Sequence, residues 1–223
     1  MNGNINLTEA KLLINNVVSR AWKGYGSALF LEVGEIIDEK GIYTIFVGYN
    51  WRIESPKKVL LSGYYSGPRI EKLIKNLEKL KIDKIETLLP YHELAITFSN
   101  GLTLRSLQLG QDPPDWHMRV QSGKYLSVKR GEITLDDGSE IDFDEEIEEI
   151  DSYEDVTARW GKPKSGENKG VCYDCRNFVR LDGNYHLLDY GVCIHEMGPF
   201  DGRVINRNSY CEKFEAEIDA DNF

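Results

Sequence analysis

The four cysteines of this chain are the residues whose type and spacing point most directly to chemistry, and all of them lie in the last 52 residues. Cys172 and Cys175 form a Cys-x-x-Cys pair, and Cys193 and Cys211 follow at intervals of 18 residues. A Cys-x-x-Cys turn brings two thiolates to one ion, and two further cysteines complete a tetrahedral shell. A segment of about 50 residues buries little apolar surface, so a metal would supply folding free energy. We therefore predict a closed metal centre with four ligands: Cys172, Cys175, Cys193 and Cys211.

The identity of the metal is left open by this pattern. Four thiolates suit zinc or an iron–sulfur cluster. Zinc is the favoured prediction, although zinc ribbons have two close cysteine pairs and this chain has one pair and two single cysteines. Disulfides are disfavoured because no secretory signal is visible and we expect a cytoplasmic protein. His195 is expected outside the filled shell. Aromatic residues would surround either centre: Tyr173, Phe178, Tyr190, Phe200, Tyr210 and Phe214.

The charge of the chain is unevenly distributed. The net charge is −10, yet residues 1–130 hold 18 basic and 13 acidic residues, a net of +5. Residues 131–159 hold one basic and 13 acidic residues, and residues 160–223 hold 8 basic and 11 acidic residues. This distribution argues against a general nucleic-acid binder. We predict a domain over residues 1–130, an acidic segment and linker over 131–170, and a metal-binding module over 171–216.

The acidic segment allows two interpretations. Dense like charge favours an extended, solvated linker. Alternatively, Phe143, Ile147 and Ile150 have the spacing of one face of a short helix, which could dock on a basic partner or on the basic part of this chain. The Gly-, Pro- and Ser-containing stretch over residues 161–170 is predicted to be a second linker.

The pattern of apolar residues predicts an α+β domain, an antiparallel sheet with two helices, over residues 1–130. Leu12, Leu13, Ile14, Val17 and Val18 indicate a helix over about 8–20. A second helix follows Gly67-Pro68, because apolar residues recur at helical spacing from Ile70 to Leu80. Runs of β-branched and aromatic residues predict strands near residues 28–33, 43–47, 51–54, 59–61, 85–89, 94–98, 102–104, 116–120 and 125–128.

One hairpin register can be predicted from the side-chain alternation. A three-residue loop, Ser99-Asn100-Gly101, would place Phe98 opposite Leu102 and Ile96 opposite Leu104. A two-residue turn would instead mix the apolar and polar faces, so the three-residue loop is preferred.

The first 130 residues contain no dinucleotide fingerprint, phosphate loop, nucleophile elbow or zinc-protease motif, so no catalytic residue is predicted. His92 is expected in a loop, and His117 on the solvent side of a strand, since it faces opposite to its apolar neighbours. Arg52 and Glu54 should share one strand face as an exposed ion pair worth less than about 1 kcal/mol.

Three stretches carry a resemblance to a known family: GSALFLE (residues 26–32), WRIE (51–54) and LAITFSNGLTL (94–104). Together they resemble a family of small uncharacterised bacterial cytosolic proteins that is linked to the immunity proteins of polymorphic toxin systems. The resemblance covers residues 8–130. It implies a protein that binds another protein, and it assigns no functional residue.

The cysteine segment carries a second resemblance, through CYDCRNF (172–178), GVC (191–193), DGRV (201–204) and CEKFE (211–215). It is similar to small bacterial four-cysteine modules of unknown role. Its spacing and its Cys-x-x-Phe-Glu ending are also similar to the high-potential iron–sulfur-like small subunits of certain glycyl-radical enzymes, which implies an iron–sulfur cluster.

Three functions follow as hypotheses. The leading one is a non-enzymatic protein-binding protein, an immunity-type inhibitor of a basic toxin or nuclease, with a structural metal site and no direct contact with nucleic acid or membrane. The second is an iron–sulfur protein in electron transfer or an accessory redox subunit. The third, a metal-dependent enzyme, would require an open coordination position, and four cysteines leave no obvious vacancy.

Overall fold

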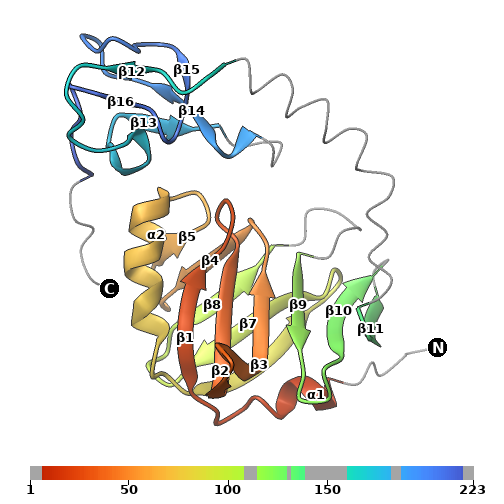
Figure 1. Cartoon of the computed structure of the whole chain (residues 1–223). Helices are drawn as coiled ribbons and strands as arrows, with labels where there is room; N and C mark the ends of the chain where they lie inside the picture. Colours follow the sequence, from red (N-terminus) through yellow and green to blue (C-terminus); the bar gives the residue numbers. More distant parts are fainter. Residues whose placement is uncertain (1–6, 108–114, 130–131, 139–159, 182–186, 218–223) are drawn as a thin grey trace. The chain divides into compact units, whose positions relative to one another are not determined.

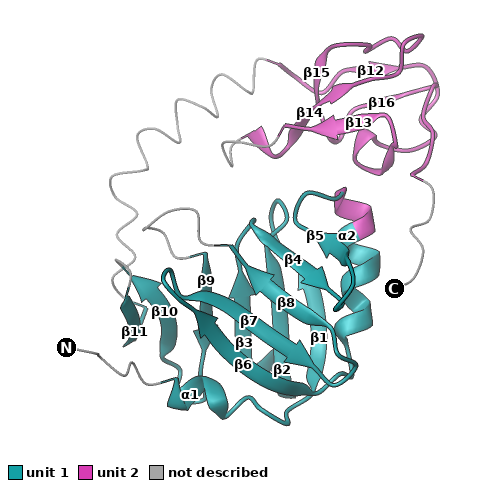
Figure 2. Ribbon diagram, turned by 180° about the vertical axis from the view of Figure 1, so that it is seen from behind, with its two compact units in different colours: residues 1–65, 70–140, 222–223 teal, residues 66–69, 141–221 magenta. Residues whose placement is uncertain are grey.

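The computed structural model of the chain describes residues 7–107, 115–129, 132–138, 160–181 and 187–217. Within these ranges the chain is mostly antiparallel β-sheet with few helices, and it forms two compact units (Figures 1 and 2). The first unit contains residues 1–65, 70–140 and 222–223, and the second contains residues 66–69 and 141–221.

The first unit contains strands β1 to β11, the helix α1, the part of helix α2 from Ile70 onward, and η1, a single 3₁₀ turn. Their bounds are α1 Thr8–Lys11, β1 Val18–Lys23, β2 Leu29–Ile37, β3 Lys40–Val47, β4 Trp51–Glu54, β5 Val59–Ser62, α2 Gly67–Leu73, η1 Ile74–Leu77, β6 Ile82–Leu88, β7 Glu93–Phe98, β8 Thr103–Ser106, β9 Trp116–Arg119, β10 Tyr125–Lys129 and β11 Glu132–Asp136.

Two antiparallel sheets are layered in this unit (Figures 1 and 2). The six-stranded sheet has the order β1-β2-β3-β9-β10-β11, and the five-stranded sheet has the order β5-β4-β8-β7-β6. Alternate residues are buried in β3, β4, β8 and β9, as period-2 side-chain alternation requires. The core residues include Leu29, Leu31, Ile45, Val47, Trp51, Ile53, Ile96, Phe98, Leu104, Trp116 and Met118. The apolar faces of the two sheets therefore form one shared core.

The helix predicted over residues 8–20 is wrong beyond its first turn. The α1 helix ends at Lys11, and Asn15 adopts a left-handed backbone conformation with φ 69°, which a continuing helix does not allow. The following residues pair with other strands: Val17 forms a bridge with Lys81, and Val18 pairs with Val33 in β2. Pairing of β-branched valines in a sheet therefore overrides the helical spacing of the apolar residues.

The hairpin register is confirmed, and the second predicted helix is confirmed as far as Leu77, three residues short of Leu80. Helix α2 begins at Gly67 and continues as η1 to Leu77, with its apolar residues buried. In the β7–β8 hairpin, Ile96 pairs with Leu104, and the Phe98 N–H donates to the Leu102 carbonyl at 2.9 Å. The strand pattern thus determined the register correctly, because a slip would expose the buried side chains.

Strand β11 lies beyond the predicted domain limit at residue 130. It pairs with β10 from Lys129↔Glu132 to Tyr125↔Asp136 and so adds the sixth strand to its sheet. The acidic core of the following segment, with Phe143, Ile147 and Ile150, lies outside the described residues, so its two interpretations both stay predictions.

The second unit is built from short elements. They are β12 Lys164–Ser165, the 3₁₀ turn η2 Cys172–Asp174, β13 Phe178–Arg180, β14 Tyr190–Cys193, β15 Val204–Asn206 and β16 Tyr210–Cys211. Strands β13, β14 and β15 form an antiparallel sheet, and β12 pairs in parallel with β16. Residues 164 and 165, in the predicted second linker, are therefore paired in a sheet.

None of the helices in the described ranges is long and apolar enough to span a membrane.

Candidate functional site

The four cysteines of the second unit stand at turns between its short strands. Cys172 begins the η2 turn, and its carbonyl accepts the Cys175 N–H at 3.0 Å. The Cys175 and Cys211 carbonyls accept the N–H groups of Phe178 and Phe214, each three residues later, at 3.1 and 3.2 Å. Cys193 ends β14. Such tight turns hold a cysteine backbone in place with local hydrogen bonds.

Three of the cysteines meet in the small core of this unit. Cys172, Cys193 and Cys211 are buried in one apolar cluster with Phe200 and Ile205. Phe178 packs against this cluster, while Cys175 is half-buried. None of the four thiols is joined in a disulfide. Of the six aromatic residues predicted as an apolar shell, Phe178 and Phe200 thus belong to the group around the cysteines.

The cysteines that share this cluster also affect the pKa of one another's thiols. Burial, followed by the nearby sulfurs of Cys175, Cys211 and Cys193, raises the pKa of Cys172 to about 12. Burial also raises the pKa of Cys193, although the backbone N–H of His195 donates to its sulfur and opposes that shift. Without a cation, these buried thiols stay protonated, because burial disfavours the charged form.

The type of the four side chains suits a metal ion, but their arrangement in the structure does not form a metal site. As placed, the described residues contain no group of three or more His, Cys, Asp or Glu side chains that could hold one. The donor chemistry nevertheless fits a thiophilic metal: two thiols of one turn, Cys172 and Cys175, and two from other parts of the unit are unbridged, and three of the four share one apolar cluster. A bound cation would deprotonate them and draw their sulfurs together.

A polar network joins the segments that follow the cysteines. The Glu215 carboxylate accepts hydrogen bonds from Arg176 Nε at 2.6 Å and Asn177 Nδ2 at 3.0 Å, and it lies 3.9 Å from His195 Nε2. The Arg176 N–H also donates to the Glu215 carbonyl at 2.9 Å, and the Ile194 N–H donates to the Asn177 carbonyl at 2.9 Å. Glu215 therefore connects the residues after Cys175, Cys193 and Cys211. No local pattern signals this role, since Glu215 and its partners are 20 to 39 residues apart in the chain.

The outer face of the β13–β14–β15 sheet presents a row of valines. Val179 pairs with Val192, which pairs with Val204, so the three side chains cross the sheet on one face. Val179 and Val204 are 49% and 39% exposed. The loop from β14 to β15 adds two more exposed apolar side chains, Ile194 and Met197, the latter 80% exposed. We call Val179, Val192 and Val204 the valine row.

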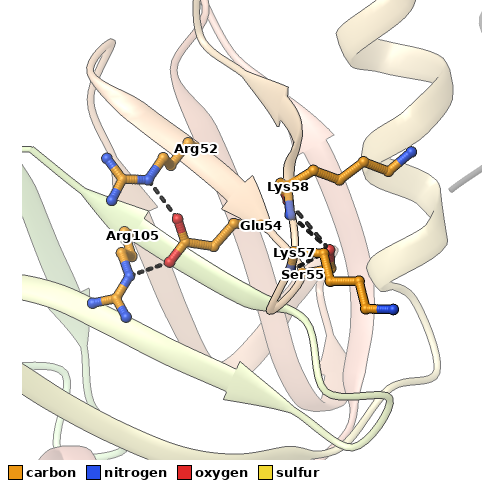
Figure 3. A network of polar contacts seen from close by, with 6 residues as sticks. All are labelled: Arg52, Glu54, Ser55, Lys57, Lys58 and Arg105. Carbon is orange, nitrogen blue, oxygen red and sulfur yellow. Dashed lines mark hydrogen bonds and ion pairs between the residues drawn. The ribbon is translucent and has the colours of Figure 1, made fainter.

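In the first unit, the predicted pair of Arg52 and Glu54 is confirmed and extended. Arg52 Nε and Arg105 Nε donate to the two carboxylate oxygens of Glu54 at 2.6 and 2.5 Å (Figure 3). Burial raises the pKa of Glu54, but hydrogen bonds and positive charge from Arg105 and Arg52 outweigh it and leave the pKa below its ordinary value. The sequence did not reveal Arg105, because only the pairing of β4 with β8 brings it to this place.

His117 lies in a row of rings that crosses the six-stranded sheet. Trp22 stacks on Phe30 at 4.0 Å between ring centroids, and Phe46 stacks on His117 at 4.4 Å. Phe30 meets Phe46 edge to face at 5.1 Å, as His117 meets Tyr125 at 5.8 Å. His117 does face away from the core, as predicted, but these rings half-bury it. Burial lowers the pKa of His117 to about 4, against a weaker opposing effect of a nearby carboxylate.

His92 lies between β6 and β7, as predicted, with φ 56°. Its carbonyl accepts the indole N–H of Trp116 at 2.9 Å, so it has a structural role in that turn.

A buried carboxylate on the six-stranded sheet was missed by the sequence analysis. Glu32 is buried, and it accepts hydrogen bonds from the Gly41 N–H at 2.9 Å, the Thr44 hydroxyl at 2.7 Å and the Trp22 indole at 3.3 Å. Its three donors come from β1 and β3, on either side of its own strand. From the strand pattern alone, a glutamate at this position would be expected to be exposed. Only the tertiary structure shows that Glu32 links neighbouring strands.

Comparison with known protein families, curated proteins and solved structures finds no match to this chain.

Proposed function

We propose that this protein is a non-catalytic protein-binding protein whose second unit is organised by one metal ion held by Cys172, Cys175, Cys193 and Cys211. The observation that carries the proposal is the construction of this unit. Its small core consists largely of cysteines, while Val179 and Val204 are exposed. A unit that exposes apolar side chains and buries thiols has the composition of a metal-stabilised recognition module.

The metal would act on structure. Four cysteine ligands fill a tetrahedral shell and leave no position for water or substrate. The bound metal would supply the charge that keeps the four thiolates deprotonated in their apolar setting. Residues around the cysteines support the centre: Phe178 and Phe200 exclude water, and the His195 N–H donates to the Cys193 sulfur. Zinc is the metal that we propose.

The valine row is the proposed contact surface for a protein partner. Exposed apolar side chains grouped on one sheet face are typical of recognition surfaces. A partner of basic character, such as a toxin or nuclease that this protein inhibits, would in addition be attracted over longer distances by the net charge of −10.

Metal analysis and an absorption spectrum of the anaerobically purified native chain test the metal centre. One equivalent of zinc in colourless protein is the expected result. Protein without a stoichiometric metal, or with any two cysteines joined in a disulfide, would overturn the metal centre.

Substitutions at the valine row test the protein-binding function. Val179→Glu and Val204→Glu should abolish the recovery of a partner that co-purifies with the wild-type chain. Val59→Glu is the matched control, because Val59 lies in the first unit with the same 49% exposure as Val179. The protein-binding function fails if no partner co-purifies, or if Val59→Glu and Val179→Glu reduce recovery equally.

An iron–sulfur protein in electron transfer is the second candidate function. The hydrogen bond to the Cys193 sulfur and the apolar residues around the thiols favour it, because both features tune the reduction potential of a cluster. If the purified protein is brown and contains iron and acid-labile sulfide, the centre on the same four cysteines is an iron–sulfur cluster and not zinc.

A further inference from the structure

Two arginines face each other on the five-stranded sheet of the first unit. Arg52 on β4 and Arg105 on β8 are direct cross-strand partners, so their side chains leave the sheet side by side on one face. Like charges placed directly opposite destabilise a sheet unless an anion lies near them. Glu54 is the anion that the chain supplies, and both guanidinium groups hold it through their Nε atoms.

The cluster of two guanidinium groups and one carboxylate has a net charge of +1. Glu54 remains ionised at neutral pH, and both arginines are permanently charged. Its neighbours across the sheet are uncharged: Thr103 pairs with Glu54, and Ala95 pairs with Arg105. The direct cross-strand partners thus supply no counterion, and Glu86, which follows Ala95 in the same row, forms its own ion pair with Lys84 at 2.6 Å.

The donors that remain on the two arginines are arranged for an anion. A guanidinium group has five N–H donors, and only the Nε donor of each is used here. In the part of the chain that the structure describes, the terminal nitrogens of Arg52 and Arg105 have no hydrogen-bond partner. Figure 3 shows both guanidinium groups on the same side of the Glu54 carboxylate, with their terminal nitrogens directed away from it. Their side chains are 35% and 28% exposed.

Two nearby lysines do not contribute to this arrangement. The backbone N–H groups of Lys57 and Lys58 donate to the Ser55 hydroxyl at 3.3 Å, and Figure 3 shows their side chains extending away from the guanidinium groups. The local positive charge therefore comes from Arg52 and Arg105.

We propose that Arg52 and Arg105 form a binding site for a carboxylate group of a ligand or partner. A carboxylate matches the fork of a guanidinium group and carries one negative charge, which neutralises the cluster. Glu54 orients both arginines before the ligand arrives, so little side-chain entropy is lost on binding. This site is independent of the metal centre and of the valine row.

Titrations of the full-length wild-type chain with glutarate and with a hexaglutamate peptide test the site, with inorganic phosphate as the comparison at constant ionic strength. The Nε–Hε resonances of Arg52 and Arg105 should shift together and saturate with both carboxylate probes. Stronger binding of hexaglutamate would identify an acidic protein segment as the source of the carboxylate. Equal binding would identify a small carboxylate compound.

Variants separate a binding site from a surface ion pair. Arg52→Gln and Arg105→Gln should each weaken carboxylate binding about ten-fold, because each removes charge-assisted hydrogen bonds. Glu54→Gln should strengthen it about four-fold, because the glutamine keeps an acceptor oxygen that can still orient an arginine while the nearby negative charge is lost. Lys84→Gln is the matched control, because Lys84 lies in the same sheet and pairs with Glu86 at 2.6 Å.

Several results would overturn the site. They are the absence of saturable shifts, tighter binding of phosphate than of either carboxylate, and weaker carboxylate binding by Glu54→Gln. An equal loss of binding in Lys84→Gln and Arg52→Gln would overturn it as well. The Glu54→Gln result decides the question even if an arginine variant fails to fold.

Discussion

The stability of the first unit should depend on pH through His117. This imidazole stacks on Phe46 and meets the edge of Tyr125, and burial lowers its pKa from 6.5 to about 4. The folded unit therefore holds the neutral imidazole in the range in which the unfolded chain binds a proton. Because the unfolded state binds more protons between pH 4 and 6.5, stability falls as the pH is lowered through this window.

The size of the effect follows from the two pKa values. Their difference of about 2.5 units corresponds to a loss of about 3 kcal/mol once the pH is below 4. Between pH 8 and pH 5 the same values give a loss of about 2 kcal/mol. Above pH 7 the contribution of His117 to the free energy of unfolding should be constant.

The variant His117→Phe removes the titrating group and keeps a ring between Phe46 and Tyr125. Urea unfolding at pH 5 and pH 8, followed on amide resonances of β3 and β9, reports on the first unit alone. The wild type should lose about 2 kcal/mol more than the variant on acidification. An imidazole pKa above 6 in a nuclear magnetic resonance titration, or the same pH dependence in both chains, would refute the reasoning.

The structure makes three further predictions. Gly41→Ala should destabilise the first unit by about 2 kcal/mol or more in urea unfolding, because its Cβ would lie 2.6 to 2.8 Å from backbone atoms of Val33 and Tyr43. Gly101→Ala is the comparison: its added Cβ would meet no atom within 4 Å, so this variant measures only the cost of the positive φ of +81°. Glu215→Ala should release the proposed metal several-fold faster to a chromogenic chelator, since Glu215 connects the segments that follow three of the cysteines; the exposed Glu196→Ala is its control. Removal of the metal with a strong chelator should unfold the second unit, and hydrogen exchange should show the first unit still protected.

Each of these has a clear contradicting outcome. Wild-type stability of Gly41→Ala would mean that β2 and β3 are not as close as described. If the Glu215 and Glu196 variants release the metal at equal rates, Glu215 makes only a surface contact and does not support the metal centre. Loss of protection in both units on chelation would show that the first unit depends on the metal.

Local patterns in the sequence were sufficient for most of the strands. Runs of β-branched and aromatic residues placed β3 and β4 close to their observed bounds and found the first part of β2, and alternation of apolar residues placed β7 to β9 and determined the register of the β7–β8 hairpin. This worked because one face of each strand is buried, and a shift by one residue would expose that face. The same reasoning failed at residues 12–18, where helical spacing and β-branched residues conflict and strand pairing decides the outcome.

The sequence by itself determined the cysteine spacing, the uneven charge and the side of the strand on which Arg52, Glu54 and His117 lie. These are properties of residue type and of period, which need no long-range contact. Only the tertiary structure decided that Arg105 completes the cluster around Glu54, that the rings of Phe46 and Tyr125 cover His117, and that Glu215 connects the segments after three cysteines. These groups come from residues far apart in the chain, and which strands pair depends on the whole core and not on any local pattern.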